Sequence, residues 1–210
     1  VVGPGGLPTP EKIVAKWAAA LAGYGIVPGT TPPAEVAARV ADTPVRPHLV
    51  AALDGWLART RDEPVRAALA AADPDPFRDE VRRAVAAGDG GRLAALAGHD
   101  GWAAQPPGLA AAFATSAHVP APAARDLLAR LALRRPDDFG LLMQLARDER
   151  VGTAADRVRW YQAAVALRPR NIAAVTNLGA TLEELGDPAG AAAAYREAIR
   201  LDPGAAIPHN

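Results

Sequence analysis

The sequence predicts an all-α fold, and three observations support that class. Apolar residues recur at spacings of three and four, as on one face of a helix, without the sustained alternation that strands show. The 20 prolines and 19 glycines fall between these stretches, where they end and begin helices. Hydrophobic residues make up 50% of the chain, and many are alanine, which favours helix and buries little area. We therefore expect short helices in close contact.

Residues 10–135 are expected to form an irregular series of helices after a linker at residues 1–9. Several of these helices begin near a proline; Asp75 and Pro76, for example, suit an N-cap and a first helical turn. The apolar stripes of the successive helices are Ile13, Trp17, Leu21 and Tyr24; Val36 and Val40; Leu49, Leu53, Trp56 and Leu57; Val65 and Leu69; Phe77, Val81 and Val85; Leu93 and Leu96; Leu109 and Phe113; and Leu127, Leu128 and Leu131. The pattern is weakest from 91 to 120.

The charge balance limits the classes of partner. With 23 basic and 23 acidic residues the formal net charge is +0, which argues against a basic face for nucleic acid or an anionic membrane. No apolar run reaches the roughly 18 residues that a membrane-spanning helix needs. The chain has no cysteine, which excludes disulfides and cysteine-bound zinc. We expect a cytoplasmic protein that binds no cofactor, no metal and no nucleic acid and does not insert into membranes.

The C-terminal part of the chain, residues 136–210, contains an internal repeat. Residues 161–169 resemble residues 195–203, at an offset of about 34 residues. Upstream, Leu145-Ala146 corresponds to Leu178-Gly179 at an offset one residue shorter. The earlier copy is therefore expected to have a turn that is one residue shorter.

This repeat resembles the tetratricopeptide motif, most closely in its later copy. Small residues at Gly179, Ala191 and Ala198 would let neighbouring helices approach, and Tyr195 would fill the gap between them. In the earlier copy, Arg157 stands where the motif prefers alanine. The residues expected to pack the repeats are Leu145, Tyr161, Ala164, Leu178, Gly179, Ala191, Tyr195, Ala198 and Pro203.

The resemblance implies an architecture for the whole chain. Repeats are expected at about 138–170 and 172–205, and another would start at 206. One such hairpin cannot bury its own apolar face, so repeats stack on one another. We expect a right-handed α-solenoid of antiparallel helix pairs, with residues 10–135 forming an irregular N-terminal stack.

In tetratricopeptide proteins the first helix of each repeat lines a groove, which implies a protein or peptide partner here. The corresponding residues are Met143, Gln144, Arg147, Arg150, Thr176, Asn177, Ala180 and Glu183. Asn177 can bond a peptide backbone through both its donor and its acceptor, and Arg147 and Arg150 favour an acidic stretch or a terminal carboxylate. The family's chaperone-binding carboxylate clamp looks absent, since Thr176 and Ala180 replace its Lys and Asn. An ordinary solvated face is the alternative at every position.

A wider resemblance covers most of the chain. Its landmarks are the segments 51–56, 72–78 and 135–139, followed by the repeats. This order is similar to the region after the catalytic domain in planctomycete-type bacterial serine/threonine protein kinases. The resemblance implies that this chain is the accessory, partner-binding part of such a kinase, with the catalytic domain N-terminal to it.

Short motifs that could carry catalysis lack their partners in this sequence. Asp138-Phe139-Gly140 spells the kinase magnesium motif, but no glycine-rich loop, strand lysine or catalytic loop accompanies it, so we interpret it as a helix start. Ser116 has no nucleophile elbow. The histidines, none at metal-ligand spacing, are His48, His99, His118 and His209. The carboxylates interpreted as cap residues rather than a cation site are Asp73, Asp75, Asp79 and Glu80.

These observations leave three hypotheses about function. The first is a non-catalytic interaction module, the regulatory segment of a larger signalling protein. The alternative is a structural subunit whose copies stack head to tail into a filament. An enzyme is the least favoured hypothesis, because no set of residues in the sequence forms a recognisable catalytic motif.

Overall fold

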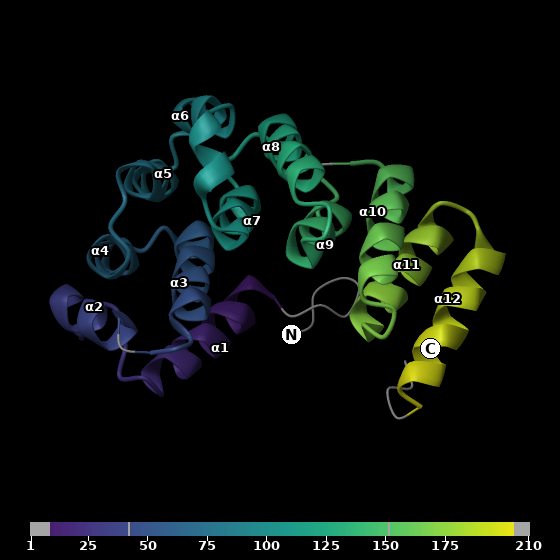
Figure 1. Cartoon of the computed structure of the whole chain (residues 1–210), viewed down its shortest axis with the longest axis horizontal. Coiled ribbons are helices and arrows are strands. Elements are labelled where there is room, and N and C mark those ends of the chain that lie inside the picture. Colours follow the sequence, from purple (N-terminus) through teal and green to yellow (C-terminus); the bar gives the residue numbers. More distant parts are fainter. Residues whose placement is uncertain (1–8, 42, 151, 204–210) are drawn as a thin grey trace. The chain divides into compact units, whose positions relative to one another are not determined.

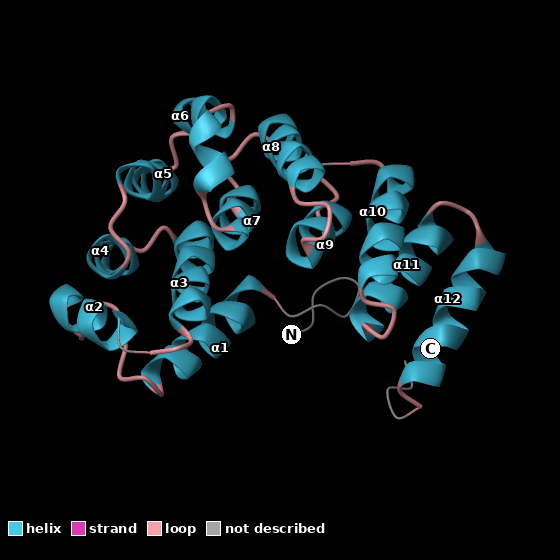
Figure 2. Ribbon diagram, viewed as in Figure 1, coloured by secondary structure: helices cyan, strands magenta, loops and turns pink. Residues whose placement is uncertain are grey.

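The structure is a computed structural model that describes residues 9–41, 43–150 and 152–203. Over this part of the chain every regular element is a helix, joined to the next by a loop or turn (Figure 2). The predicted all-α class is therefore confirmed. The expected linker, apart from Thr9, and the expected start of another repeat at 206 lie outside the described residues.

Contacts among the helices divide the chain into two compact units, residues 1–124 and 125–210. The division falls within α8 (Ala121–Arg134), whereas the sequence suggested a boundary at 135, just before Pro136. Proline ends a helix, but it does not by itself separate two cores. The division into repeats remains a prediction.

The first unit contains seven α-helices among its described residues (Figure 1). They are α1 (Pro10–Ala22), α2 (Pro33–Ala41), α3 (Arg46–Thr60), α4 (Glu63–Ala72), α5 (Pro76–Ala87), α6 (Gly90–Ala97) and α7 (Pro107–Thr115), with a 3-10 helix at Asp100–Ala104 between the last two. Proline stands in the first turn of most of them, as the sequence indicated. The Asp75 side chain caps α5 by accepting from the Arg78 N–H at 2.8 Å.

Helix α3 is the centre of this unit, because it packs against α1, α2, α4, α5 and α7. It is buried around much of its circumference, and its buried residues include Leu53, Asp54 and Leu57. Trp17 of α1 lies so close to Gly55 that a Cβ there would be 2.6 Å from the ring. The guanidinium of Arg59 lies 5.0 Å from the centre of the same ring, a cation–π contact. A helix enclosed in this way leaves little room for solvated side chains.

Trp102 is a core residue of the segment 91–120, where the apolar pattern of the sequence is weakest. It is 2% exposed, and its indole N–H donates to the Leu96 carbonyl at 2.7 Å. Its ring meets Phe77 and Phe113 edge-on, at 5.3 and 5.0 Å between ring centres. Trp102 could not be predicted as a core residue from the sequence, because its neighbours, glycine and alanine, give no periodic signal.

The second unit is a run of consecutively packed helices. Besides α8 it contains α9 (Phe139–Arg147), α10 (Ala154–Leu167), α11 (Ile172–Glu184) and α12 (Pro188–Leu201). Contacts join α9 to α10, α10 to α11 and α11 to α12. Short turns make such neighbours antiparallel, as in an α-solenoid. Polar side chains cap the N-termini of α9, α10, α11 and α12; in that order they are Asp138, Thr153, Asn171 and Asp187.

Helices α11 and α12 approach each other closely at Gly179. A Cβ on Gly179 would lie 2.8 Å from Cε1 and 2.9 Å from Cδ1 of Tyr195. Ala191 and Ala198, on the same helix as Tyr195, are 3% and 5% exposed. The two helices therefore touch through small side chains on either side of one aromatic ring.

Replacing Gly179 with alanine is expected to destabilise the chain by about 1–3 kcal/mol, because the added Cβ overpacks against the Tyr195 ring. This exceeds the gain in helix propensity, which is about 1 kcal/mol. The matched control is Gly91→Ala in α6, where the nearest atom to a new Cβ is Asp89 Oδ1 at 3.6 Å. Urea unfolding of both variants measures the difference. Equal effects of the two substitutions would contradict the close approach.

Candidate functional site

The sequence-predicted groove residues lie on α9 and α11 and in the turn after α9. Arg147, Ala180 and Glu183 are exposed, and Gln144, Thr176 and Asn177 are half-buried. Met143 is 9% exposed and belongs to the core rather than to the face. We use the term α9/α11 face for Gln144, Arg147, Thr176, Asn177, Ala180 and Glu183. It is polar, with one cation and one anion.

Arg150 does not share this face. Helix α9 ends at Arg147, so Arg150 lies in the following turn. Its guanidinium donates to both oxygens of Asp148, at 3.0 and 2.7 Å. This contact raises the pKa of Arg150. The prediction extended the first helix of the earlier repeat to the length of the later one, whereas α9 is one turn shorter than α11.

Asn177 is half-buried on α11, and Tyr161 of α10 is 4% exposed. Burial raises the pKa of Tyr161, while Arg147 and the Asn177 side chain act in the opposite direction. The Asn177 amide can both donate and accept a hydrogen bond.

Tyr195 occupies the equivalent position one repeat later, but its hydroxyl has different surroundings. It donates to Glu183 Oε2 at 3.2 Å. Burial raises the pKa of Tyr195, and the neighbouring Glu183 raises it further. The two tyrosines therefore share a packing role and differ in the polar group that they meet.

Arg157 is the main departure of the earlier repeat from its motif. It is 5% exposed, and its guanidinium pairs with Glu184 at the end of α11 and with Glu149, 3.5 Å away in the turn after α9. Its Nε has no hydrogen-bond partner among the described residues. A buried cation thus joins three segments where the motif has alanine. The departure itself was visible in the sequence, but its partners were not.

The predicted packing residues are distributed as follows. Leu145, Tyr161, Ala164, Gly179, Ala191 and Ala198 are buried, Leu178 and Tyr195 are half-buried, and Pro203 is exposed. Val175, Ala194 and Ala198 form an apolar cluster with Val165, Ile172 and Leu201 packed against it. This cluster joins α10, α11 and α12 beneath the polar residues.

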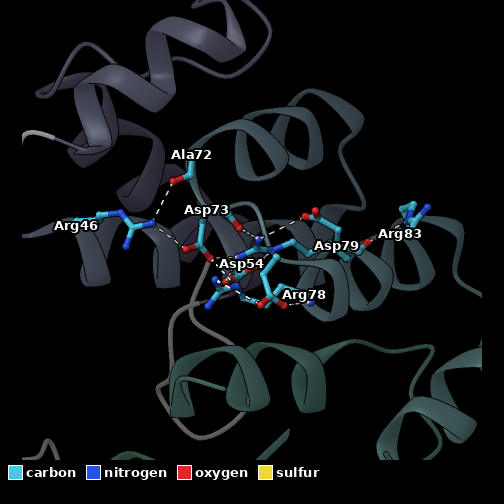
Figure 3. Close-up of polar contacts among 9 residues, drawn as sticks. Arg46, Asp54, Ala72, Asp73, Arg78, Asp79 and Arg83 are labelled. Carbon is cyan, nitrogen blue, oxygen red and sulfur yellow. Dashed lines mark hydrogen bonds and ion pairs between the residues drawn. The ribbon is translucent and has the colours of Figure 1, made fainter. Parts of the chain in front are cut away.

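A second polar cluster is buried in the first unit, where α3, α4 and α5 meet (Figure 3). Arg82 of α5 donates to both oxygens of Asp54 on α3, at 2.8 and 3.1 Å. It also donates to a carboxylate oxygen of Asp73, at 2.9 Å, and to the Asp73 carbonyl, at 2.9 Å. All three residues are at most 5% exposed. One guanidinium therefore connects three helices.

Two further arginines complete this cluster around Asp73 (Figure 3). Arg46 pairs with Asp73 Oδ1 at 3.0 Å, and Arg78 Nε lies 3.1 Å from Oδ2. Burial raises the pKa of the Asp54 carboxyl, while the hydrogen bonds from Arg82 act in the opposite direction. The arginines therefore place positive charge opposite two buried carboxyl groups.

Of the carboxylates interpreted as caps, Asp75 caps α5 with its side chain. The interpretation is wrong for the other three, which pair with arginines: Asp73, Asp79 and Glu80. No group of three or more metal-ligating side chains occurs among the described residues. In the kinase-like triplet, Asp138 caps α9 by accepting from the Leu141 N–H at 3.0 Å. Phe139 lies 4.4 Å below the Arg168 guanidinium. Two of the three residues, Asp138 and Phe139, therefore have structural contacts.

Replacing Arg82 with alanine is expected to destabilise the chain by about 3–5 kcal/mol, because it leaves two buried carboxylates without their shared cation. The neighbouring Arg83→Ala is the control, since Arg83 is exposed and is expected to change stability by less than about 0.5 kcal/mol. Chemical unfolding of the full chain measures both. A loss no larger for Arg82 than for Arg83 would show that the cluster is solvated.

Comparison with known proteins supports the assignment of the C-terminal helices. Residues 173–205, which include α12 and all of α11 except Ile172, match the family model of the tetratricopeptide repeat. No curated protein and no solved structure gave a match. In the described part of the chain, no helix has both the length and the apolar character needed to cross a membrane. The chain therefore carries a tetratricopeptide repeat formed by α11 and α12.

Proposed function

We propose that the chain is a non-catalytic protein-interaction module whose partner binds on the α9/α11 face. The observation that supports this most directly is the tetratricopeptide repeat at residues 173–205, since such repeats generally bind proteins. The face adds half-buried and exposed polar groups on a rigid helical support. A partner segment can use these groups for orientation, while the apolar cluster beneath keeps the helices in place.

We also propose that this module is the accessory segment of a bacterial serine/threonine kinase-like signalling protein, in the cytoplasm. Support comes from the landmark segments 51–56 and 72–78. Asp54, Asp73 and Arg78 of these segments meet in the buried cluster, so the landmarks coincide with a structural feature. The test is the coding sequence upstream of Val1. A kinase catalytic loop there supports the proposal, and an unrelated domain counts against it.

Head-to-tail self-assembly is the second candidate. Ile199 of α12 is 49% exposed and Leu185, just before this helix, is 47% exposed, which gives copies of the chain an apolar surface to share. Light scattering over a concentration series distinguishes the candidates. A mass that does not change with concentration argues against the filament.

Peptides selected by display from a random library should lose binding when Ala180 is replaced by arginine. Ala180 is an exposed alanine in the middle of α11, so a large charged side chain there obstructs the face without disturbing the core. The matched control is Ala193→Arg, an exposed alanine on α12 outside the face. Fluorescence anisotropy is expected to show at least a roughly tenfold weaker Kd for the first variant only. Equal binding to both variants would place the partner elsewhere.

A further inference from the structure

Glu183 is the anion of the α9/α11 face, and a hydrogen bond from the next helix holds it. It is an exposed residue in the last turn of α11. Tyr195 of α12 donates its hydroxyl to Glu183 Oε2 at 3.2 Å. Burial raises the pKa of Tyr195, and Glu183 raises it further, so the phenol is protonated at neutral pH. The carboxylate is therefore the acceptor, and its position is fixed in the free protein.

Glu183 has no cation as a partner within the described part of the chain. The neighbouring Glu184 binds Arg157, the buried cation of α10. On α12, Arg200 donates to both oxygens of Glu197, at 2.7 and 2.6 Å. The hydrogen bond from Tyr195 occupies Oε2 of Glu183, and Oε1 is left for a donor from outside the described chain.

The end of α11 adds negative charge at the same place. The carbonyl groups in the last turn of a helix carry partial negative charge, which favours a cation there and disfavours an anion. Helix α9 has Arg147 in its last turn and α12 has Arg200, but α11 has no basic residue there. A cation bound at Glu183 would therefore interact favourably with the carboxylate and with the end of the helix.

The earlier repeat has the opposite charge at the equivalent position. The offset that relates Leu145 to Leu178 relates Arg150 to Glu183. Arg150 is neutralised within the chain, because it donates to both oxygens of Asp148. Packing of a repeat therefore does not require a carboxylate at this position, and the later repeat presents one without a cation.

We propose that Glu183 binds a basic side chain, from Lys or Arg, of the partner segment, and that Tyr195 is the positioning residue that holds its carboxylate. This contact requires that the partner occupies the α9/α11 face, so it rests on the proposed function. Because Tyr195 already orders the carboxylate, less side-chain freedom is lost on binding. Tyr195, which the sequence assigned only to packing, then also acts on the face.

The probes are three pentapeptides, titrated into the full chain and followed by ¹H–¹⁵N NMR of the α11 amides. The first is acetyl-Ala-Ala-Lys-Ala-Ala-amide, and the other two have Nε-acetyl-lysine or Glu in place of Lys. The Lys peptide is expected to bind about fivefold more tightly than the acetyl-lysine peptide, because an exposed ion pair at a helix end has a modest effect. The Glu peptide is expected to bind most weakly. Equal binding of the Lys and acetyl-lysine peptides, or no binding of the Lys peptide, would overturn the proposal.

Two glutamates provide a matched pair of variants. Glu183→Gln removes the charge, keeps the shape of the side chain, and is expected to abolish the fivefold preference for the Lys peptide. Glu197→Gln makes the same change on α12 outside the face, at a glutamate that pairs with Arg200, and should leave the preference unchanged. Equal effects of the two variants would show a general effect of charge and contradict a site at Glu183.

Tyr195→Phe tests the positioning role. The variant keeps the ring against Gly179 and removes the donor to Glu183. It is expected to weaken the Lys peptide about twofold, to leave the acetyl-lysine peptide unchanged, and to have no further effect when Glu183 is already Gln. A loss that is the same for both peptides, or that persists in the Gln variant, would show that Tyr195 is structural only.

Failure of this inference and failure of the proposed function give different results. If Ala180→Arg abolishes binding of the selected peptides while Glu183→Gln leaves it unchanged, the partner binds on the face and Glu183 does not select it. If the Lys peptide depends on Glu183 while no selected peptide depends on Ala180, the cation site is real and the partner does not cover the face.

Discussion

The close approach of α11 and α12 at Gly179 is the constraint on which the second unit depends. The Tyr195 ring occupies the space that any larger residue at position 179 would need. Because Ala191 and Ala198 are the buried neighbours on the same helix, the contact uses little side-chain volume, and the Tyr195 hydroxyl donates to Glu183 of α11 beside it. Thr176 and Asn177 of α11 stay half-buried. Tight apolar contact on one side of a helix leaves polar side chains on its other side.

In the first unit, closely packed helices are joined by buried ion pairs. Helix α3 contacts five other helices, so a polar residue on it has little access to water. Asp54 is such a residue, and its burial is compensated by both arms of the Arg82 guanidinium. Such a pair contributes little net stability, but it permits only one arrangement of the helices that carry it. The cluster therefore affects how the helices are arranged more than it affects the net stability of the fold.

The sequence predicted the helices better than the contacts between them. Proline starts and Asp caps act within one turn, so the cap at Asp75 could be read directly. Asp54 and Arg82 are 28 residues apart, and no local pattern pairs them. The only hint was a charge at position 82 between the apolar residues Val81 and Val85. Trp102 was missed for the related reason that its partners come from other helices.

Arg157 shows how one substitution within a repeat can redirect its surface. Ala191, its counterpart in the later repeat, packs without polar demands, whereas Arg157 must be paired because an uncompensated buried cation is costly. Its partners, Glu149 and Glu184, are 82% and 56% exposed, so they keep contact with water while neutralising it. The contact between α10 and α11 therefore includes a buried ion pair beside its apolar side chains, whereas the polar contact between α11 and α12 is the exposed hydrogen bond from Tyr195 to Glu183. The buried charge of Arg157 therefore distinguishes the contact between α10 and α11 from the corresponding contact one repeat later, where a buried alanine needs no partner.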